Sequence, residues 1–216
     1  MAPEVFNLPN DGGQWAIQEK TTEFAQKAIA SLKQSGFATD TEFGRIVVRL
    51  IRAALLDKTI YREVCADPAA AGESRKAMAG LIAVNSLIPV FLSLGSLSIQ
   101  TLVAVAAMAV VQALGWYARA WVVQLVAANW LKKNLVFTQI FRPLIYAQAP
   151  TALGFIPVLG QLIGLWALVT NTSAIRDTTG CTTVQAVVLS VAGFVGVTAC
   201  ASVVSPIVSG IFRMVG

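Results

Sequence analysis

The sequence predicts an all-α protein, a polytopic bundle of about five transmembrane helices that follows an N-terminal helical segment. Apolar residues make up 56% of the chain and charged residues only 12%, whereas soluble domains carry about 25% charged residues. Residues 77–118 and residues 143–175 contain no charged side chain. Because one crossing takes about 20 apolar residues, the first run is long enough for two helices and the second is too long for one.

Charge divides the chain into unequal parts. Residues 1–76 hold ten acidic and ten basic residues, whereas residues 77–216 hold six basic residues and one acidic residue, Asp177. The net charge of +5 therefore comes from the expected membrane bundle. Because its basic residues are scattered between apolar runs, they indicate membrane topology and not nucleic-acid binding. We expect a leader and helix over residues 1–38, a basic helix and linker over residues 39–76, and the bundle over residues 77–216.

The first of these regions begins with an irregular leader over residues 1–14, which contains two prolines and two glycines. It lacks the basic start and apolar core of a cleaved signal peptide. Residues 15–35 predict a helix of mixed polarity, and Gly36 is a plausible terminator. This region is expected to lie in the cytoplasm.

The second region contains an amphipathic helix. Thr39 and Glu42 fit the spacing of a capping box, which predicts a helix over residues 43–64. Arg45, Arg49 and Arg52 share one stripe of that helix, beside an apolar face. In one interpretation, the helix lies among the lipid headgroups with its arginines toward anionic lipid. In the other, it packs on the membrane bundle with a solvated basic side, and the two interpretations are compatible.

The membrane bundle is expected to open with helices near residues 77–94 and 99–121, the second continuing to Lys133. Trp116, Tyr117 and Trp121 surround Arg119, and such aromatic clusters mark a membrane–water interface. The arginine is therefore expected to extend to the headgroups. An intramembrane charge that serves transport would need a partner acid, and residues 77–175 contain none.

A broken-helix hairpin is expected next, with helices over residues 134–155 and 158–175. Pro157 divides them, because its ring disfavours helical geometry in the preceding residue. Tyr146, Pro150 and Trp166 belong to this hairpin.

The final helix is expected over residues 182–212. Small residues four apart let helices approach closely in lipid. Gly160 with Gly164, and Ala192 with Gly196, therefore predict helix-packing faces.

The residue inventory gives little basis for catalysis. Ten of the eleven carboxylates precede residue 77, and the chain has no histidine. The three cysteines, Cys65, Cys181 and Cys200, are far apart in the sequence. No acid pair, no ordinary base for a nucleophile and no metal cluster can be assembled in the membrane region. We expect neither an enzyme nor a bound cofactor.

Several stretches resemble the Yip1-domain family of integral membrane proteins. Residues 43–68, followed by apolar helices, resemble the pre-membrane segment of bacterial members. Ile-Tyr-Ala-Gln-Ala-Pro at residues 145–150, with Pro157 and Trp166, is similar to the family's Tyr-x-x-x-Pro helix and Trp-bearing helix. Residues 178–186 resemble its loop into the last helix.

That resemblance implies five transmembrane helices in a bacterial cytoplasmic membrane. Eukaryotic members are associated with vesicle trafficking, Rab GTPase binding and membrane shaping, whereas bacterial members share no assigned activity. Residues 1–38 lie outside the resemblance. The N-terminal segment shows nothing that would carry over a GTPase-binding surface.

The leading hypothesis is a non-enzymatic scaffold, accessory subunit or membrane-shaping protein. Its expected partners are anionic lipids and the subunits of a larger membrane complex. The positive-inside rule places the N-terminus in the cytoplasm. One alternative is a channel or small-solute transporter with a site at the broken helices near Pro150 and Pro157. Another alternative is a subunit of a pigment- or redox-bearing complex.

Overall fold

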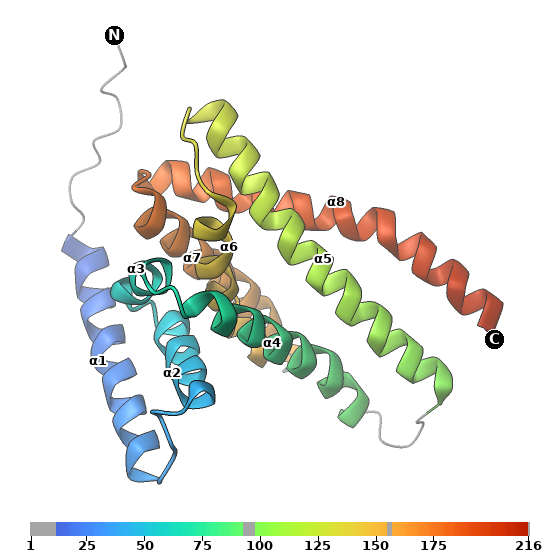
Figure 1. Cartoon of the computed structure of the whole chain (residues 1–216), viewed down its shortest axis with the longest axis horizontal. Coiled ribbons are helices and arrows are strands. Elements are labelled where there is room, and N and C mark those ends of the chain that lie inside the picture. The colour runs from blue at the N-terminus through green and yellow to red at the C-terminus, as the bar shows by residue number, and fades with distance from the viewer. Residues whose placement is uncertain (1–11, 93–97, 155–156, 216) are drawn as a thin grey trace.

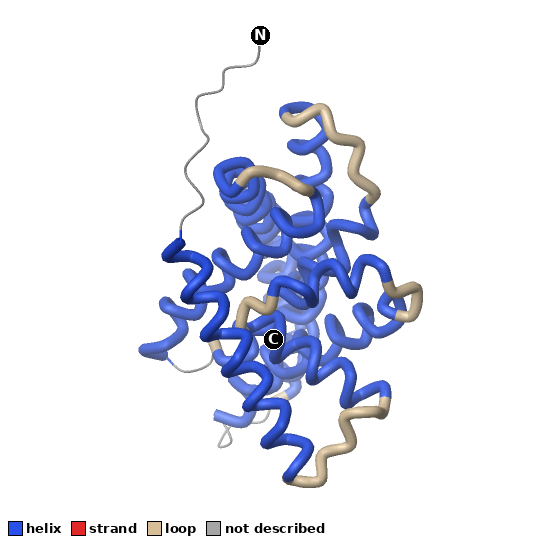
Figure 2. Tube along the Cα trace, turned by 90° about the vertical axis from the view of Figure 1, so that its left-hand side faces the viewer, coloured by secondary structure: helices blue, strands red, loops and turns tan. Residues whose placement is uncertain are grey.

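The computed structural model describes residues 12–92, 98–154 and 157–215 (Figure 1), and within these ranges every regular element is a helix. The expected all-α class is confirmed for this part of the chain (Figure 2). The elements are α1 (Gly12–Gln34), α2 (Glu42–Ala54), α3 (Lys58–Ala66), α4 (Ala70–Leu92), α5 (Ile99–Trp130), α6 (Phe137–Ala147), the 3₁₀ helix η1 (Ala149–Leu153), α7 (Pro157–Thr179) and α8 (Thr183–Val215).

Two long helices dominate the architecture. Figure 1 shows α5 and α8 crossing and extending together away from α1, α2 and α3, and the C-terminus lies at the far end of α8. α4 packs against α5, and α6 and α7 pack between the N-terminal helices and the α5–α8 pair. The buried core joins residues of α2 to α8 in one cluster. The boundary expected between residues 76 and 77 falls within α4.

The structure has two helices that are long and apolar enough to cross a membrane, over Thr101–Trp130 and Thr183–Val204 of the described residues. Five membrane helices are not confirmed. The segment expected as a span over residues 134–155 forms α6, which has 11 residues, and the separate η1. At 1.5 Å per residue, α6 is about 16 Å long, which is roughly half of the hydrocarbon thickness.

Several helix ends follow the sequence signals closely. α1 ends before Gly36, whose φ of +83° is the left-handed conformation that glycine adopts without strain. α7 begins at Pro157, where a missing backbone N–H costs nothing. α5 begins at Ile99, as expected, and ends at Trp130, three residues before the expected Lys133. Residues 93–97, between the two helices expected near residues 77–94 and 99–121, lie outside the described residues.

The expectation of a single helix over residues 43–64 is wrong, because the structure has two helices there, α2 and α3. Leu56 adopts φ +58° between them, and Asp57 accepts a hydrogen bond from the Thr59 backbone N–H at 3.0 Å. Asp57 is thus the N-cap of a new helix. The apolar periodicity continues across this break, which is why the sequence pattern did not reveal it.

The capping box expected at Thr39 is also wrong. Thr41 is the N-cap of α2, and its hydroxyl accepts from the Gly44 backbone N–H at 3.1 Å. The same hydroxyl donates to the carbonyl of Ala38 at 2.8 Å, so it joins the α1–α2 connection to the first turn of α2.

Replacing Thr41 with alanine should therefore lower the free energy of unfolding by about 1 kcal/mol, because the Gly44 N–H loses its partner. Thr39→Ala is the matched control and should change stability by less than about 0.5 kcal/mol. Thermal unfolding of the purified chain, followed by circular dichroism, measures both. Equal effects of the two variants would show that Thr41 does not cap α2.

The α5–α8 contact depends on glycines. A Cβ placed on Gly196 would lie 2.7 Å from Cγ2 of Val122, and one placed on Gly193 would lie 2.8 Å from Cγ of Arg119. Gly196 and Gly193 thus lie where α8 approaches α5 closely, whereas Ala192 is partly exposed. Gly164 is exposed, and its Cβ position meets no atom of the described residues within 4 Å, so the described part of the chain gives it no packing partner. The side-chain surroundings of Gly160 lie outside the described residues.

Candidate functional site

The three arginines of α2 bind acidic side chains of this chain. Arg49 bonds Asp67 at 2.6 Å and also pairs with Glu73. Arg45 reaches the other Glu73 oxygen, at 2.9 Å. We call this group, completed by Arg52, Asp57 and Glu63, the arginine–carboxylate network.

Arg52 completes the network at the α2–α3 junction. Its guanidinium bonds Asp57 and Glu63, each at 2.7 Å, and donates to the Thr59 hydroxyl at 2.7 Å. The network therefore contains three guanidinium groups and four carboxylates. Such a set has no net positive charge to attract anionic lipid. The expectation of a solvated basic side is therefore wrong. α2 does pack on the bundle, but its three arginines are paired with carboxylates.

Burial of the network is uneven. Arg49 is 7% exposed and Glu73 is 2% exposed, whereas the Arg45 side chain is 49% exposed. Burial alone would lower the pKa of Arg49, but the bond to Asp67 and the charge of Glu73 outweigh it and raise that pKa. The Arg49 guanidinium in turn lowers the pKa of Asp67 below its ordinary value of 3.8. Arg49 is therefore the central cation that joins α2 to α4.

The network predicts acid sensitivity. Burial raises the pKa of Asp57, but the hydrogen bonds from Arg52 and Thr59 lower it by more than burial raises it. The folded-state pKa therefore lies below 3.8. A lowered folded-state pKa gives stability that is present above the unfolded-state pKa and is lost as the pH falls through the folded-state pKa.

We therefore expect the thermal midpoint to be constant above about pH 5 and to fall below about pH 4. The Asp57→Asn variant, which cannot titrate at this position, should show a smaller fall than the natural chain. Equal acid profiles for the two proteins would contradict this assignment.

Two side chains of α7 form hydrogen bonds with polar groups at the break between α6 and η1. The Thr170 hydroxyl donates to the Ala147 carbonyl at 2.7 Å, and the Gln148 amide donates to Oδ1 of Asn171 at 2.9 Å. Both α7 side chains are fully buried. A buried polar group without such a partner would cost free energy. The polar groups that a transporter would need at this break are thus bonded to each other.

The remaining hairpin residues are structural supports. Trp166 donates its indole N–H to the Ala54 carbonyl at 2.7 Å, which satisfies the C-terminal end of α2. Tyr146 is fully buried, and Pro150 is buried in η1. α2 also contacts α6 and η1, which carry Tyr146 and Pro150, whereas Pro157 lies at the N-terminal end of α7, nine residues before Trp166.

Arg119 is the feature that the sequence interpretation placed wrongly. Its side chain is buried, with 6% of the residue exposed, and it does not extend to the headgroups. Its Nε and Nη1 atoms have no hydrogen-bond partner among the described residues. The guanidinium carbon lies 4.1 Å from the centroid of the Phe194 ring, which is a cation–π contact.

Arg119 lies far from both ends of α5. Trp130 comes eleven positions after it, so Arg119 lies about 16 Å along the axis from the end of the helix. An unpaired buried charge costs several kcal/mol, and a desolvated cation–π contact, which stabilises by about 2 kcal/mol or somewhat more, offsets only part of that cost. Ionisable residues inside a membrane are by default functional-site candidates.

A small cavity adjoins this arginine. Its volume is about 10 Å³, room for roughly one sphere of the size of a water molecule. The lining comes from α5, α6 and the residue that follows α6: Trp116, Arg119, Phe141, Leu144, Ile145 and Gln148.

The expected aromatic cluster is divided between two faces of α5. Trp116 is 8% exposed and lies on the inner face with Arg119, three residues later. Tyr117 and Trp121 are 41% and 57% exposed and lie on the outer face. Tyr117 also stacks on Phe141, with ring centroids 4.6 Å apart. The outer pair keeps the character expected of a lipid-facing surface, whereas the inner pair lines the cavity.

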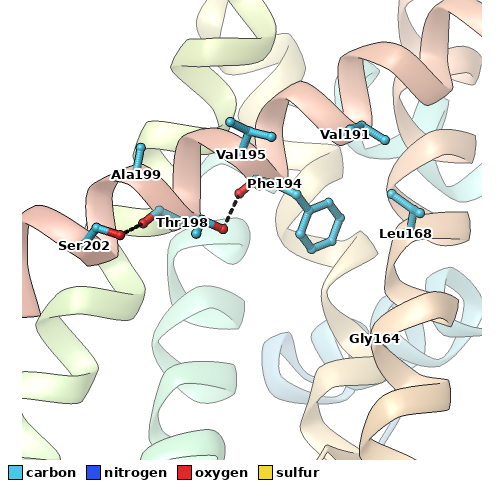
Figure 3. Close-up of a pocket in the computed structure, with 8 residues that line it drawn as sticks. All are labelled: Gly164, Leu168, Val191, Phe194, Val195, Thr198, Ala199 and Ser202. Carbon is cyan, nitrogen blue, oxygen red and sulfur yellow. Dashed lines mark hydrogen bonds between the residues drawn. The ribbon is translucent and has the colours of Figure 1, made fainter.

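An open apolar groove of about 500 Å³ lies between α7 and α8 (Figure 3). Gly164 and Leu168 border it from α7, and α8 contributes Val191, Phe194, Val195, Thr198, Ala199 and Ser202. The hydroxyl groups of Thr198 and Ser202 bond carbonyls one turn earlier in their own helix, at 3.1 and 2.9 Å. The groove therefore presents an apolar surface.

In comparisons with known proteins, no family model, no curated protein and no solved structure matches this chain.

Two parts of these sites escaped the sequence interpretation. Glu73 was not recognised as the acid that binds Arg45 and Arg49, although it lies at the start of the long apolar run. A lone acid in that position was a usable signal, because it must find a cation or remain in water. Gly193, whose missing side chain lets Arg119 lie between α5 and α8, gave no distinct signal among small residues.

Proposed function

We propose that this chain is a non-enzymatic integral membrane protein in which α5 and α8 cross the membrane, and in which α4 carries the chain across the membrane ahead of α5. The remaining helices form a cap that presents the protein to partner subunits. In this role the protein is a scaffold or accessory subunit of a larger membrane complex. The observation that carries the proposal is the exposed apolar surface of α5 and α8.

That surface is extensive. Only 11% of the most apolar part of α5 and 17% of that of α8 is buried inside the molecule. A core helix of a soluble protein is mostly buried, so water is an unfavourable environment for these two helices. Lipid removes that cost, because the surface of α5 and α8 is as apolar as acyl chains.

Charge favours one orientation. Lys132 and Lys133 follow the end of α5, and Arg176 lies near the end of α7, shortly before α8 begins. Figure 1 places these helix ends at the same end of the α5–α8 pair. Lys133 also donates to the carbonyls of Thr179 and Gly180, at 3.0 and 3.1 Å. Basic residues concentrate on the cytoplasmic side of membrane proteins, so we propose that this end and the N-terminal helices face the cytoplasm. Residence in a bacterial cytoplasmic membrane is part of the same proposal.

A matched pair of variants tests the membrane assignment. Val195 in α8 and Phe24 in α1 are both 63% exposed. If α8 lies in lipid, Val195→Arg places a charge in hydrocarbon, at a cost of about 2.5–3.5 kcal/mol at a helix centre. Phe24→Arg, in water, should be tolerated. We expect alkaline extraction to release more of the first variant from membranes than of the second. Equal retention of both variants would overturn the assignment of α8.

The scaffold role is tested by purifying the full chain from its native membrane in mild detergent or nanodiscs, with mass spectrometry of co-migrating proteins. A stoichiometric membrane complex is the expected result. A chain that migrates alone would contradict the accessory-subunit role. Liposome flux assays would then test the channel or transporter alternative, against which the Gln148–Asn171 bond argues. Membership of the Yip1 family and a place in a pigment- or redox-bearing complex remain predictions.

A further inference from the structure

We propose that the cavity beside Arg119 binds one small monovalent anion, of the size of chloride, as the counter-ion of this buried arginine. Only 6% of Arg119 is exposed, so this residue is 94% buried. Its Nε and Nη1 atoms, which are strong donors, have no acceptor among the described residues.

The charge cannot be removed by deprotonation, because a guanidinium group stays protonated in proteins. Nor do the described contacts of Arg119 include a carboxylate: its one charge-related contact is with the ring of Phe194. The negative face of that ring stabilises a cation but supplies no acceptor for N–H groups. A bound anion supplies both the missing charge and the missing acceptor.

The size of the cavity selects the kind of anion. A volume of about 10 Å³ accepts roughly one sphere of the size of a water molecule. A carboxylate or a phosphate has three or more heavy atoms and does not fit beside Phe141, Leu144 and Ile145. A lipid headgroup is excluded for the same reason. A halide is monatomic and needs only a small relaxation of the lining side chains.

The surroundings would strengthen such a bond. Trp116, Leu144 and Ile145 shield the cavity from solvent, and an electrostatic attraction is stronger in a medium of low dielectric constant. Gly193 and Phe194 of α8 lie against the arginine side chain. The anion would therefore stabilise the α5–α8 crossing in addition to neutralising the charge.

Equilibrium dialysis of the full chain in detergent against radiolabelled chloride, in a gluconate background of constant ionic strength, tests the proposal. We expect one saturable site per chain, displaced by bromide and not by gluconate. The thermal midpoint should rise by about 5–10 °C at a chloride concentration 100-fold above the dissociation constant. Absence of saturable binding to the natural chain would overturn the proposal, whatever the variants do.

Variants and crystallography locate the site. Arg119→Gln should abolish both the binding and the chloride-dependent shift, whereas Arg142→Gln, which changes a partly exposed arginine of α6, should keep both. If Arg119→Gln does not fold, anomalous diffraction from bromide-exchanged crystals of the natural chain decides the question. Bromide beside the Arg119 guanidinium is the expected result. Bromide found only elsewhere, or chloride binding that survives Arg119→Gln, would refute the assignment.

Discussion

Replacing Arg49 with methionine should lower the free energy of unfolding by about 3 kcal/mol. The change removes the cation that bonds Asp67 at 2.6 Å and pairs with Glu73, which is 2% exposed. Breaking a buried pair by removing one partner typically costs about 3–5 kcal/mol, because the other charge is left without compensation. We expect the lower end of this range, since Arg45 still reaches Glu73 at 2.9 Å. Chemical unfolding in detergent, followed by circular dichroism, measures the loss.

Two further variants separate the network from a general effect of charge. Combining Arg49→Met with Glu73→Gln should recover a large part of the loss, because the uncompensated carboxylate is then neutral. Lys76→Met breaks an exposed pair with Glu42, in which the two side chains are 60% and 46% exposed, and should cost less than about 1 kcal/mol. A cost for Arg49→Met that is no larger than that of Lys76→Met would contradict the central role of Arg49.

Replacing Gly196 with alanine should destabilise the fold by about 2 kcal/mol, although alanine is the better helix former by about 1 kcal/mol. The added Cβ would lie 2.7 Å from Cγ2 of Val122 and 3.2 Å from its Cβ. A valine in a helix has one strongly preferred rotamer, so Val122 cannot move aside without moving α5. The thermal midpoint in detergent reports the change.

Gly164→Ala is the control, because the new methyl group would meet no atom of the described residues within 4 Å. Its expected effect has the opposite sign, a stabilisation of up to about 1 kcal/mol. Adding Val122→Ala to Gly196→Ala should relieve the collision and restore stability. Changes of the same sign at Gly196 and Gly164, or no relief by Val122→Ala, would show that Gly196 does not set the α5–α8 distance.

The membrane topology shows where sequence reasoning reached its limit. Uncharged runs identify α5 and α8 correctly, because their length and hydropathy are local properties. The same reasoning expected a spanning helix over residues 134–155, where the structure has α6 and η1. Composition cannot distinguish a segment buried in protein from one buried in lipid. That segment is covered by α2, α4, α5 and α7, and Thr170 satisfies the backbone at its break.

The direction of each arginine was likewise beyond the sequence. A stripe formed by Arg45, Arg49 and Arg52 has the same spacing whether it faces lipid headgroups or carboxylates, and the partner Glu73 is 24 residues from Arg49. Arg119 follows two aromatic residues, a pattern that also fits an interface. Only the position of α8, with Gly193 and Phe194, shows that this side chain is enclosed.

The sequence by itself determined the all-helical class, the two long apolar helices and several helix ends. Proline geometry, the left-handed preference of glycine and hydropathy act within a few residues, so a single sequence is enough to recognise them. Only the tertiary structure decided the pairing of Arg49 with Asp67 and Glu73 and the burial of Arg119. These depend on residues far apart in the chain, since a charge is stabilised by whatever the fold places beside it.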